Sequence, residues 1–253
     1  LVCLINLFDE IEIYKIRSKK DKIKFTGKFC DNINKKKNTI IDTLSLLRNK
    51  GIIDVDTKYN ILVKKKIPIF SGLGGGSSNA AFLLKNLITK KELIDNKSFF
   101  SKHLGSDLKL FFGSNQIFQK SLNRVKNLRS KLNFYFIIVY PYLKSSTKEI
   151  YSRGKFLAKY KTNKIYENGL KKIIMNNLLK EQNHLEKIVI SKFPIIKKIL
   201  FELRLLKKCQ FSRVTGSGSA CFGVFLSKKS ADLGVKKIRK KFPKFWCVVG
   251  KTI

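Results

Sequence analysis

Alternating hydrophobic and polar residues open the chain and predict two β-strands, over Leu4–Ile16 and Lys22–Thr26. Hydrophobic residues at helical spacing follow over Thr39–Arg48. Asn38 precedes this run as an N-cap, and Gly51 just after it is a stop signal. The chain therefore begins with strands followed by a helix, a mixture typical of an α+β layer.

The same reasoning predicts elements along the rest of the chain. Strands are expected over Tyr59–Ile67, Gln116–Gln119, Asn133–Tyr140, Phe211–Val214, Ala220–Leu226 and Trp246–Val249. Helices are expected to open at Ser77 and Ser78 and to cover Ser98–Leu104, Ser106–Phe111, Leu178–Ser191, Ile195–Lys207 and Lys228–Lys241. Because the pattern becomes mostly helical after Pro141, we predict an α+β protein of two domains, 1–143 and 144–253, with the boundary near Pro141–Thr147.

Composition supports a folded protein with its own core. The chain has 253 residues, of which 43% are hydrophobic. No apolar run reaches the roughly 18 residues that a membrane span needs, so no membrane partner is predicted. The five cysteines are odd in number and form no Cys-x-x-Cys pair, which argues against a disulfide framework and a zinc site.

The formal net charge of +37 raises the question of nucleic-acid binding. The lysines are spread along the whole chain, and the lysine-rich runs 19–24, 35–37 and 64–66 are short and separate. A binding face would concentrate charge, so we interpret the excess as amino-acid bias and predict no specific nucleic-acid partner. An anionic small-molecule substrate would also suit this charge.

The segment Pro68–Ser78, Pro-Ile-Phe-Ser-Gly-Leu-Gly-Gly-Gly-Ser-Ser, is the strongest chemical signal. Its four glycines fall within five positions and remove the Cβ atoms that would keep a ligand off the backbone. Ser77 and Ser78 open a helix whose free N–H groups and dipole attract an anion. No Walker Gly-Lys-Ser/Thr follows, and Ser77 takes the last glycine position of a dinucleotide fingerprint. We predict a phosphate-binding loop, in which a valine at Gly75 would block the phosphate.

Two weaker motifs accompany this loop. In Leu-Gly-Ser-Asp-Leu-Lys, Asp107 is either a helix cap or a catalytic carboxylate. In Arg-Val-Thr-Gly-Ser-Gly-Ser, residues 213–219, the glycines form either a flexible turn between two strands or a second glycine loop over the substrate.

The three motifs, in this order and over essentially the whole chain, resemble the GHMP kinase superfamily. The motifs resemble most closely the members that phosphorylate a cytidine-diphosphate-linked methylerythritol on its tertiary 2-hydroxyl, in isoprenoid precursor synthesis by the non-mevalonate pathway. Asn38 also resembles the family's Asp-Asn, although Lys37 replaces the acid. The resemblance implies a ribosomal-protein-S5-like N-terminal domain, a ferredoxin-like C-terminal domain, and a need for ATP and Mg²⁺.

The resemblance also implies roles for matching residues. Asp107 would be the catalytic base, and Gly216, Ser217 and Gly218 would form the C-terminal glycine motif. ATP phosphates would be bound by Pro68, Ile69, Phe70, Ser71, Gly72, Leu73, Gly74, Gly75, Gly76, Ser77 and Ser78.

Some positions depart from the family pattern. Lys109 replaces the usual proline, and we interpret it as a surface charge. The family's opening Ala-Lys-Ile-Asn-Leu and Asp-Gly-Tyr-His segments are absent, and the only methionine is Met175. We therefore expect a fragment that lacks the family's catalytic lysine and part of its cytidine pocket.

Three alternatives stay open at this point. The chain would otherwise be a GHMP kinase of homoserine or mevalonate type, a basic nucleic-acid-binding protein with an S5-like fold, or an inactive remnant that only binds ATP. A bacterial cytoplasm is the predicted location, and a plastid stays possible. The sequence does not decide the oligomeric state.

Overall fold

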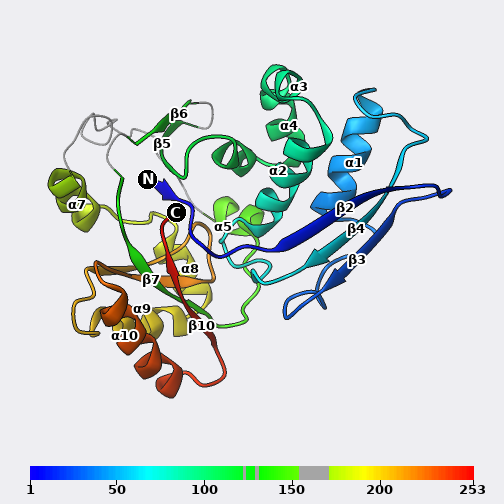
Figure 1. The fold of residues 1–253 in the computed structure, drawn as a ribbon. Coiled ribbons are helices and arrows are strands. Elements are labelled where there is room, and N and C mark those ends of the chain that lie inside the picture. The colour runs from blue at the N-terminus through cyan, green and yellow to red at the C-terminus, as the bar shows by residue number, and fades with distance from the viewer. Residues whose placement is uncertain (122–123, 129–130, 154–170) are drawn as a thin grey trace.

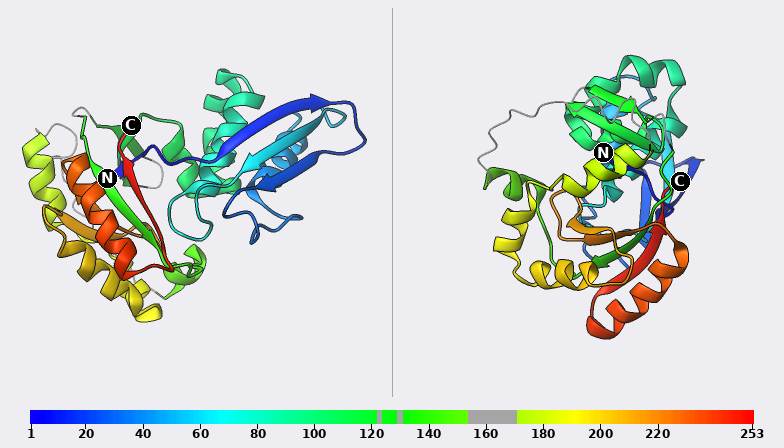
Figure 2. Two further views of the ribbon diagram at one scale, coloured as in Figure 1. Left: turned by 60° about the horizontal axis from the view of Figure 1, so that its bottom comes forward. Right: turned by 90° about the vertical axis from the view of Figure 1, so that its left-hand side faces the viewer.

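The computed structural model describes residues 1–121, 124–128, 131–153 and 171–253. Two lobes lie side by side, one built mainly from the N-terminal part of the chain, through α4 (Lys97–Leu104), and one mainly from the C-terminal part (Figures 1 and 2). Each lobe combines a sheet with helices, so the predicted α+β class is confirmed.

The first lobe is built on a three-stranded sheet in the order β2-β4-β3. The central strand β4 (Lys58–Lys64) pairs antiparallel with β2 (Glu10–Ile16) and parallel with β3 (Lys22–Thr26). The strand predicted from Leu4 is shorter than expected, because only the alternating stretch from Glu10 onward pairs with β4.

Helices cover one face of this sheet: α1 (Thr39–Asn49), α2 (Gly75–Leu87), α3 (Lys90–Asp95) and α4 (Lys97–Leu104). The predicted cap of α1 is confirmed, since the Asn38 side chain accepts hydrogen bonds from the N–H groups of Ile40 and Ile41. Ile61 and Val63, alternate residues of β4, are buried against the helices. Together with the apolar residues of the helices they form the core of this lobe.

A short 3₁₀ helix, η1 (Ser106–Phe111), and a small sheet connect the two lobes along the chain. The small sheet has the order β1-β5-β6, with β1 (Val2–Cys3), β5 (Gln116–Ser121) and β6 (Arg124–Asn127). Neither β1 nor β6 is predicted from the sequence, because both strands are short and depend on pairing with β5.

The second lobe has a four-stranded antiparallel sheet in the order β10-β7-β9-β8. Its strands are β7 (Tyr135–Tyr140), β8 (Phe211–Val214), β9 (Cys221–Phe225) and β10 (Trp246–Lys251). The helices of this part are α5 (Thr147–Ser152), α7 (Lys171–Lys180), α8 (Glu186–Lys192), α9 (Ile195–Arg204) and α10 (Lys228–Lys241).

Strand β7 shows how the second sheet is buried on both faces. Ile137 and Val139 pack against the core formed with α8, α9 and α10. Ile138 and Tyr140 point to the opposite face, in a cluster that also contains Leu73 of the glycine-rich loop. The sheet of the second lobe therefore supports the loop of the first.

One predicted helix is wrong. The pattern over Leu178–Ser191 is interrupted, since α7 ends at Lys180 and α8 begins at Glu186. The break lets the side chain of Asn183 bond outside its own segment. The domain boundary near Pro141–Thr147 stays a prediction; β7, which precedes it, belongs to the second sheet.

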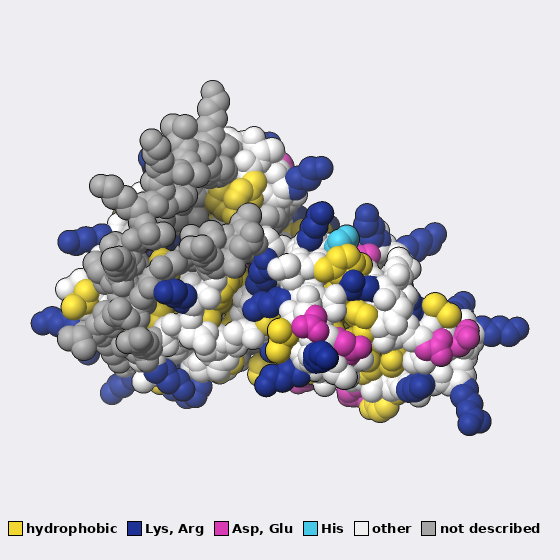
Figure 3. Space-filling model, turned by 90° about the horizontal axis from the view of Figure 1, so that it is seen from above, with side chains coloured by type: hydrophobic (Ala, Val, Ile, Leu, Met, Phe, Trp, Pro, Cys, Tyr) yellow, Lys and Arg dark blue, Asp and Glu magenta, His cyan; other side chains and the backbone are white. Residues whose placement is uncertain are grey.

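The positive charge is scattered over one face of the molecule (Figure 3). Lys and Arg side chains appear at many separate points on the face shown in Figure 3. Within the described residues, every helix is too short or too polar to span a lipid bilayer.

Candidate active site

The glycine-rich loop ends in the first turn of α2. This helix begins at Gly75, two residues before the predicted start, with Gly74 as N-cap in the left-handed region at φ 72°. Gly74 has no side chain, so no cap bonds the first N–H groups, and among the described residues the first backbone bond inside the helix comes from Ser78 to Gly74. The N–H groups of Gly75, Gly76 and Ser77 are therefore oriented for an anion.

Hydrogen bonds to its backbone fix the loop before α2. The hydroxyl of Ser71 is buried and donates to the carbonyl of Pro68 at 2.7 Å. The Ser71 carbonyl accepts from the N–H of Ala220 at 3.0 Å, and the Phe70 carbonyl accepts from the N–H of Ser145 at 3.1 Å. Both donors belong to the second lobe, so the loop is held in part by residues far along the chain.

The two glycine motifs meet in space. The hydroxyl of Thr215 donates to the carbonyl of Gly72 at 3.0 Å. A Cβ atom on Gly72, which has φ +75°, would lie 2.2 Å from the carbonyl oxygen of Thr215, and a Cβ on Gly216 would lie 3.3 Å from the carbonyl oxygen of Gly72. Glycine is required at 72 because the backbones touch there.

Hydroxyl groups of Ser145 and Thr147 form hydrogen bonds with the second glycine loop. Ser145 donates to the carbonyl of Ser217 at 2.6 Å, and the hydroxyls of Thr147 and Ser217 lie 2.9 Å apart. Ser217 is buried, so its side chain supports the loop rather than facing solvent. The segment connects the paired strands β8 and β9, as predicted for a turn between two strands, and these hydrogen bonds hold the turn in place.

The glycines at the start of α2 differ from one another. Gly75 is buried, and a Cβ there would lie 3.0 Å from the Ile67 side chain and 3.6 Å from the Lys65 Nζ. A valine at Gly75 would therefore press on the Ile67 side chain, so it would test core packing together with phosphate binding. Gly76 is exposed, and its Cβ would meet the Thr39 side chain at an ordinary 3.4 Å.

A buried ion pair lies behind the loop. The Lys65 ammonium pairs with the carboxylate of Asp9, and both side chains are almost completely buried. Asp9 also accepts from the N–H groups of Lys66 and Ile67, at 2.8 and 2.9 Å, and from Asn79 Nδ2 at 3.0 Å. This cluster ties the residues before β2 to the start of the loop and to α2.

Asp107 is placed by η1, which packs against α2. The ring of Phe111, the last residue of η1, lies 3.1 Å from the position of a Cβ on Gly74. Asp107 is the second residue of η1 and not its cap, because Gly105 holds the cap position and no side-chain cap bond forms. Ser106, the first residue of the predicted helix, is likewise inside η1 and does not cap it.

The environment of Asp107 suits proton transfer. Desolvation by the surrounding protein raises the pKa of its carboxyl above the ordinary 3.8, while a hydrogen bond with Ser106 opposes the rise. The side chain of Asp107 nevertheless keeps an exposed surface.

Lys109 is 9% exposed, so its interpretation as a surface charge is wrong. It follows Leu108, whose side chain is buried in the core of the first lobe.

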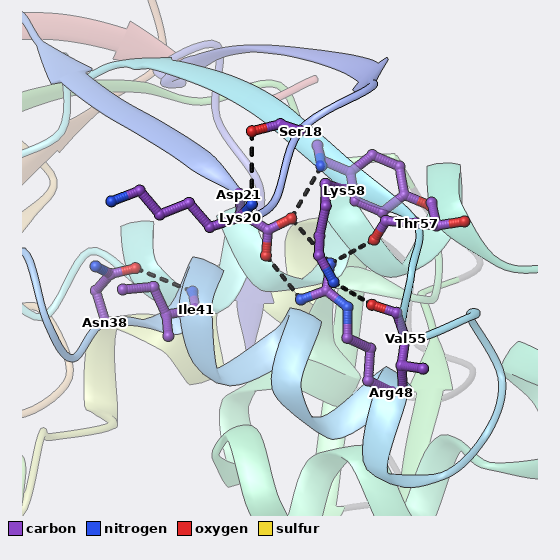
Figure 4. A network of polar contacts seen from close by, with 10 residues as sticks. Ser18, Lys20, Asp21, Asn38, Ile41, Arg48, Val55, Thr57 and Lys58 are labelled. Carbon is purple, nitrogen blue, oxygen red and sulfur yellow. Dashed lines mark hydrogen bonds and ion pairs between the residues drawn. The ribbon is translucent and has the colours of Figure 1, made fainter.

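A second charged network fixes the far end of α1 (Figure 4). Arg48 donates to both carboxylate oxygens of Asp21, at 2.7 and 2.8 Å, and to the carbonyl of Thr57 at 2.7 Å. Asp21 also accepts from the N–H of Tyr59 at 2.9 Å. Burial alone would raise the pKa of Asp21, but Arg48 and the Tyr59 N–H outweigh it and lower that pKa below 3.8. At the other end of α1, Thr39 lies beside Gly76.

No metal cage is visible in the described part of the chain, where no three His, Cys, Asp or Glu side chains gather. Mg²⁺ in phosphoryl transfer is held by one or two protein groups together with phosphate oxygens. The hydroxyls of Ser77 and Ser78 in the first turn of α2 are ligands of the type that such an ion accepts.

These features define the class of the protein. An uncapped helix start behind a glycine loop, closed by a second glycine loop and accompanied by an Asp on a short helix, is the arrangement predicted from the GHMP kinase resemblance, and residues 168–244 match the family model described as GHMP kinases C terminal. The chain is 35% identical to the 4-diphosphocytidyl-2-C-methyl-D-erythritol kinase of Pelagibacter ubique, over all of this chain and 89% of the relative. The chain therefore belongs to the family of 4-diphosphocytidyl-2-C-methyl-D-erythritol kinases.

Other comparisons agree with this family. The Prochlorococcus marinus kinase of the same name is 32% identical over 94% of this chain and 81% of its own length. A crystal structure of 4-(cytidine 5'-diphospho)-2C-methyl-D-erythritol kinase matches with a TM-score of 0.64 at 20% identity, covering 98% of this chain and 87% of that one. Homoserine kinase from Cytophaga hutchinsonii matches with a TM-score of 0.66 at 18% identity, over 97% and 85% of the two chains. These structures confirm the predicted two-domain fold but do not distinguish the acceptor.

Sequence reasoning missed several residues that build the site. Asp9, Lys65 and Asn79 were not singled out, because their partners lie far away in the sequence. Asn183 and Glu186 have the spacing of a capping box, a signal that was available. Their side chains also bond the backbone of Val214 and Gly216, at the start of the second glycine loop.

Proposed function

We propose that this chain transfers the γ-phosphoryl group of ATP to the 2-hydroxyl of 4-diphosphocytidyl-2-C-methyl-D-erythritol, in isoprenoid precursor synthesis by the non-mevalonate pathway. The observation that carries this proposal is the 35% identity, over the whole chain, to a kinase named for that substrate. The meeting of the two glycine loops at Gly72 and Thr215 supports the phosphate-binding half of the reaction.

Different residues of the chain would bind the phosphates and accept the proton. The N–H groups of Gly75, Gly76 and Ser77 would bind phosphate oxygens, and the second loop, Gly216–Gly218, would close over them. Asp107 would orient the acceptor hydroxyl and take its proton as the new oxygen–phosphorus bond forms and the bond to ADP breaks. The hydroxyls of Ser77 and Ser78 would help to hold Mg²⁺, which would supply positive charge beside the phosphates.

The acceptor is tested by comparing three candidates in separate reactions. The chain is incubated with ATP, Mg²⁺ and one acceptor at a time: the cytidine-diphosphate methylerythritol, homoserine or mevalonate. We expect ADP and a new phosphomonoester, seen by ³¹P NMR, only with the first. Transfer to homoserine or mevalonate would assign the chain to another GHMP activity. ATP binding without transfer to any acceptor would support the ATP-binding remnant instead.

A further inference from the structure

Asn183 lies between α7 and α8 and fixes three backbone groups with one side chain. Its Oδ1 accepts from the N–H of Leu185 at 3.0 Å, near the start of α8. Its Nδ2 donates to the carbonyl oxygens of Val214 and Gly216, at 2.9 and 2.8 Å. The bonding fixes the orientation of the amide, because the nitrogen faces two acceptors and the oxygen faces a donor.

Glu186, the first residue of α8, adds a bond to Val214, the last residue of β8, just before the second glycine loop. Its Oε2 accepts from the N–H of Val214 at 2.9 Å, and a charged acceptor makes such a bond stronger than a neutral one. Val189 follows on the same helix, and a Cβ on Gly218 would lie 3.0 Å from its Cγ1. Asn183, Glu186 and Val189 therefore support the second glycine loop and the end of β8 that leads into it.

Residues close to the backbone groups that Asn183 and Glu186 bond contact the first loop. Thr215, between the two carbonyls that Asn183 bonds, donates to the Gly72 carbonyl at 3.0 Å. Ala220, at the end of the second loop, donates its N–H to the Ser71 carbonyl at 3.0 Å. Moving Val214 or Gly216 would therefore change the separation of the two loops.

We propose that Asn183, assisted by Glu186, is a positioning residue for phosphoryl transfer. It holds the second glycine loop against the first, so that both enclose the phosphates in one geometry. The inference rests on the proposed function, and neither side chain is assigned contact with the reacting atoms. A displacement of about 1 Å in such a site can reduce the rate about a hundredfold.

The sharpest test is Asn183→Asp. This variant keeps the size of the side chain and an oxygen for the Leu185 N–H, but it places an acceptor against two carbonyl oxygens. Asn177→Asp is the matched control, since Asn177 Nδ2 donates to Ile173 inside α7 at 2.8 Å. We expect kcat/KM to fall about tenfold or more in Asn183→Asp, and to change by less than about twofold in Asn177→Asp.

A second pair of variants isolates Glu186. Glu186→Ala and Glu186→Gln both remove the charge, but only glutamine keeps an acceptor for the Val214 N–H. We expect Glu186→Ala to lower kcat/KM several-fold and Glu186→Gln to keep most of the activity. Equal losses in both variants would contradict a role through this bond.

Thermal unfolding and hydrogen exchange separate positioning from plain stability. We expect faster exchange of the Gly218 and Ala220 amide hydrogens in Asn183→Asp, together with the lower kcat/KM well below Tm. A lower Tm with unchanged kcat and KM in the folded enzyme would overturn the proposal. If the wild-type chain transfers no phosphate, the proposed function fails, and hydrogen exchange alone tests whether Asn183 holds the second loop against the first. Faster exchange in Asn183→Asp supports this role of Asn183, and unchanged exchange overturns it.

Discussion

The hydroxyl of Thr215 donates a hydrogen bond of 3.0 Å to the carbonyl of Gly72, across 143 positions of sequence. The same contact leaves no room for a side chain on Gly72, where a Cβ would lie 2.2 Å from the Thr215 carbonyl oxygen. The two glycine loops are therefore one structural unit, although each is built in a different lobe.

Gly72→Ala is expected to disrupt this unit, and Gly51→Ala is its matched control. Both glycines have positive φ, +75° and +69°, but a Cβ on Gly51 would meet nothing within 4 Å. Gly51→Ala should lower the free energy of unfolding by only about 1–2 kcal/mol, the strain of the left-handed conformation. Gly72→Ala should lower it by roughly 1–3 kcal/mol more through the clash. Urea unfolding compares the two; equal losses would mean that the loops can separate freely.

Gly76 is a better position than Gly75 at which to test phosphate binding, because Gly76 is exposed and Gly75 is buried. Its Cβ would meet only the Thr39 side chain at 3.4 Å, so Gly76→Val should keep the fold. If ATP phosphates approach the start of α2, the branched side chain should weaken ATP binding about tenfold or more, equal to about 1.4 kcal/mol. Calorimetric titration with ATP measures this. A folded variant with unchanged affinity would remove Gly76 from the site.

Asp107→Asn tests the catalytic carboxylate. Asparagine keeps the shape of the side chain but cannot take a proton, so activity should fall about a hundredfold or more. ATP affinity should stay near the wild-type value, because the phosphates are assigned to α2 and the loops. Activity that survives in Asp107→Asn would reject Asp107 as the base.

The pH dependence of kcat/KM, which reports the free enzyme, gives an independent check on Asp107. Desolvation raises its pKa above 3.8, so the ionised carboxylate that accepts a proton is populated only above that higher value. Activity should therefore decline on the acid side with a midpoint above 3.8, and this limb should disappear in the residual activity of Asp107→Asn. An acid limb at or below the ordinary aspartate pKa would contradict the assignment.

Any affinity for DNA should depend on the net charge alone. With a net charge of +37 and basic side chains scattered over the face in Figure 3, any complex should be weak and indifferent to sequence. Fluorescence anisotropy with two unrelated duplexes should give equal affinities that fall steeply as salt rises. A sequence-specific complex at physiological salt would favour the nucleic-acid alternative.

Local signals explain why much of the fold was predictable. Asn38 and the apolar spacing after it define α1, and the glycine run identifies the loop before α2, because each depends on neighbouring residues. The contacts that complete the site are not local: Thr215 meets Gly72, and Asp9 meets Lys65. Hydrophobic spacing alone also predicted a helix across Asn183, where bonds to a distant loop are part of the observed break.

The Arg48–Asp21 pair should stabilise the first lobe in a pH-dependent way (Figure 4). The pKa of Asp21 lies below its ordinary 3.8, because the bonds from Arg48 and the Tyr59 N–H favour the ionised form over the burial that opposes it. A lowered carboxyl pKa contributes stability that is present above pH 3.8 and is lost as the pH falls through the folded value. Asp21→Asn should lower the free energy of unfolding by about 1.5–3 kcal/mol at neutral pH, the range for hydrogen bonds to charged groups. Its unfolding free energy should approach that of the wild type in strong acid, and a difference that stays constant down to low pH would show that the carboxylate charge is not what holds α1 in place.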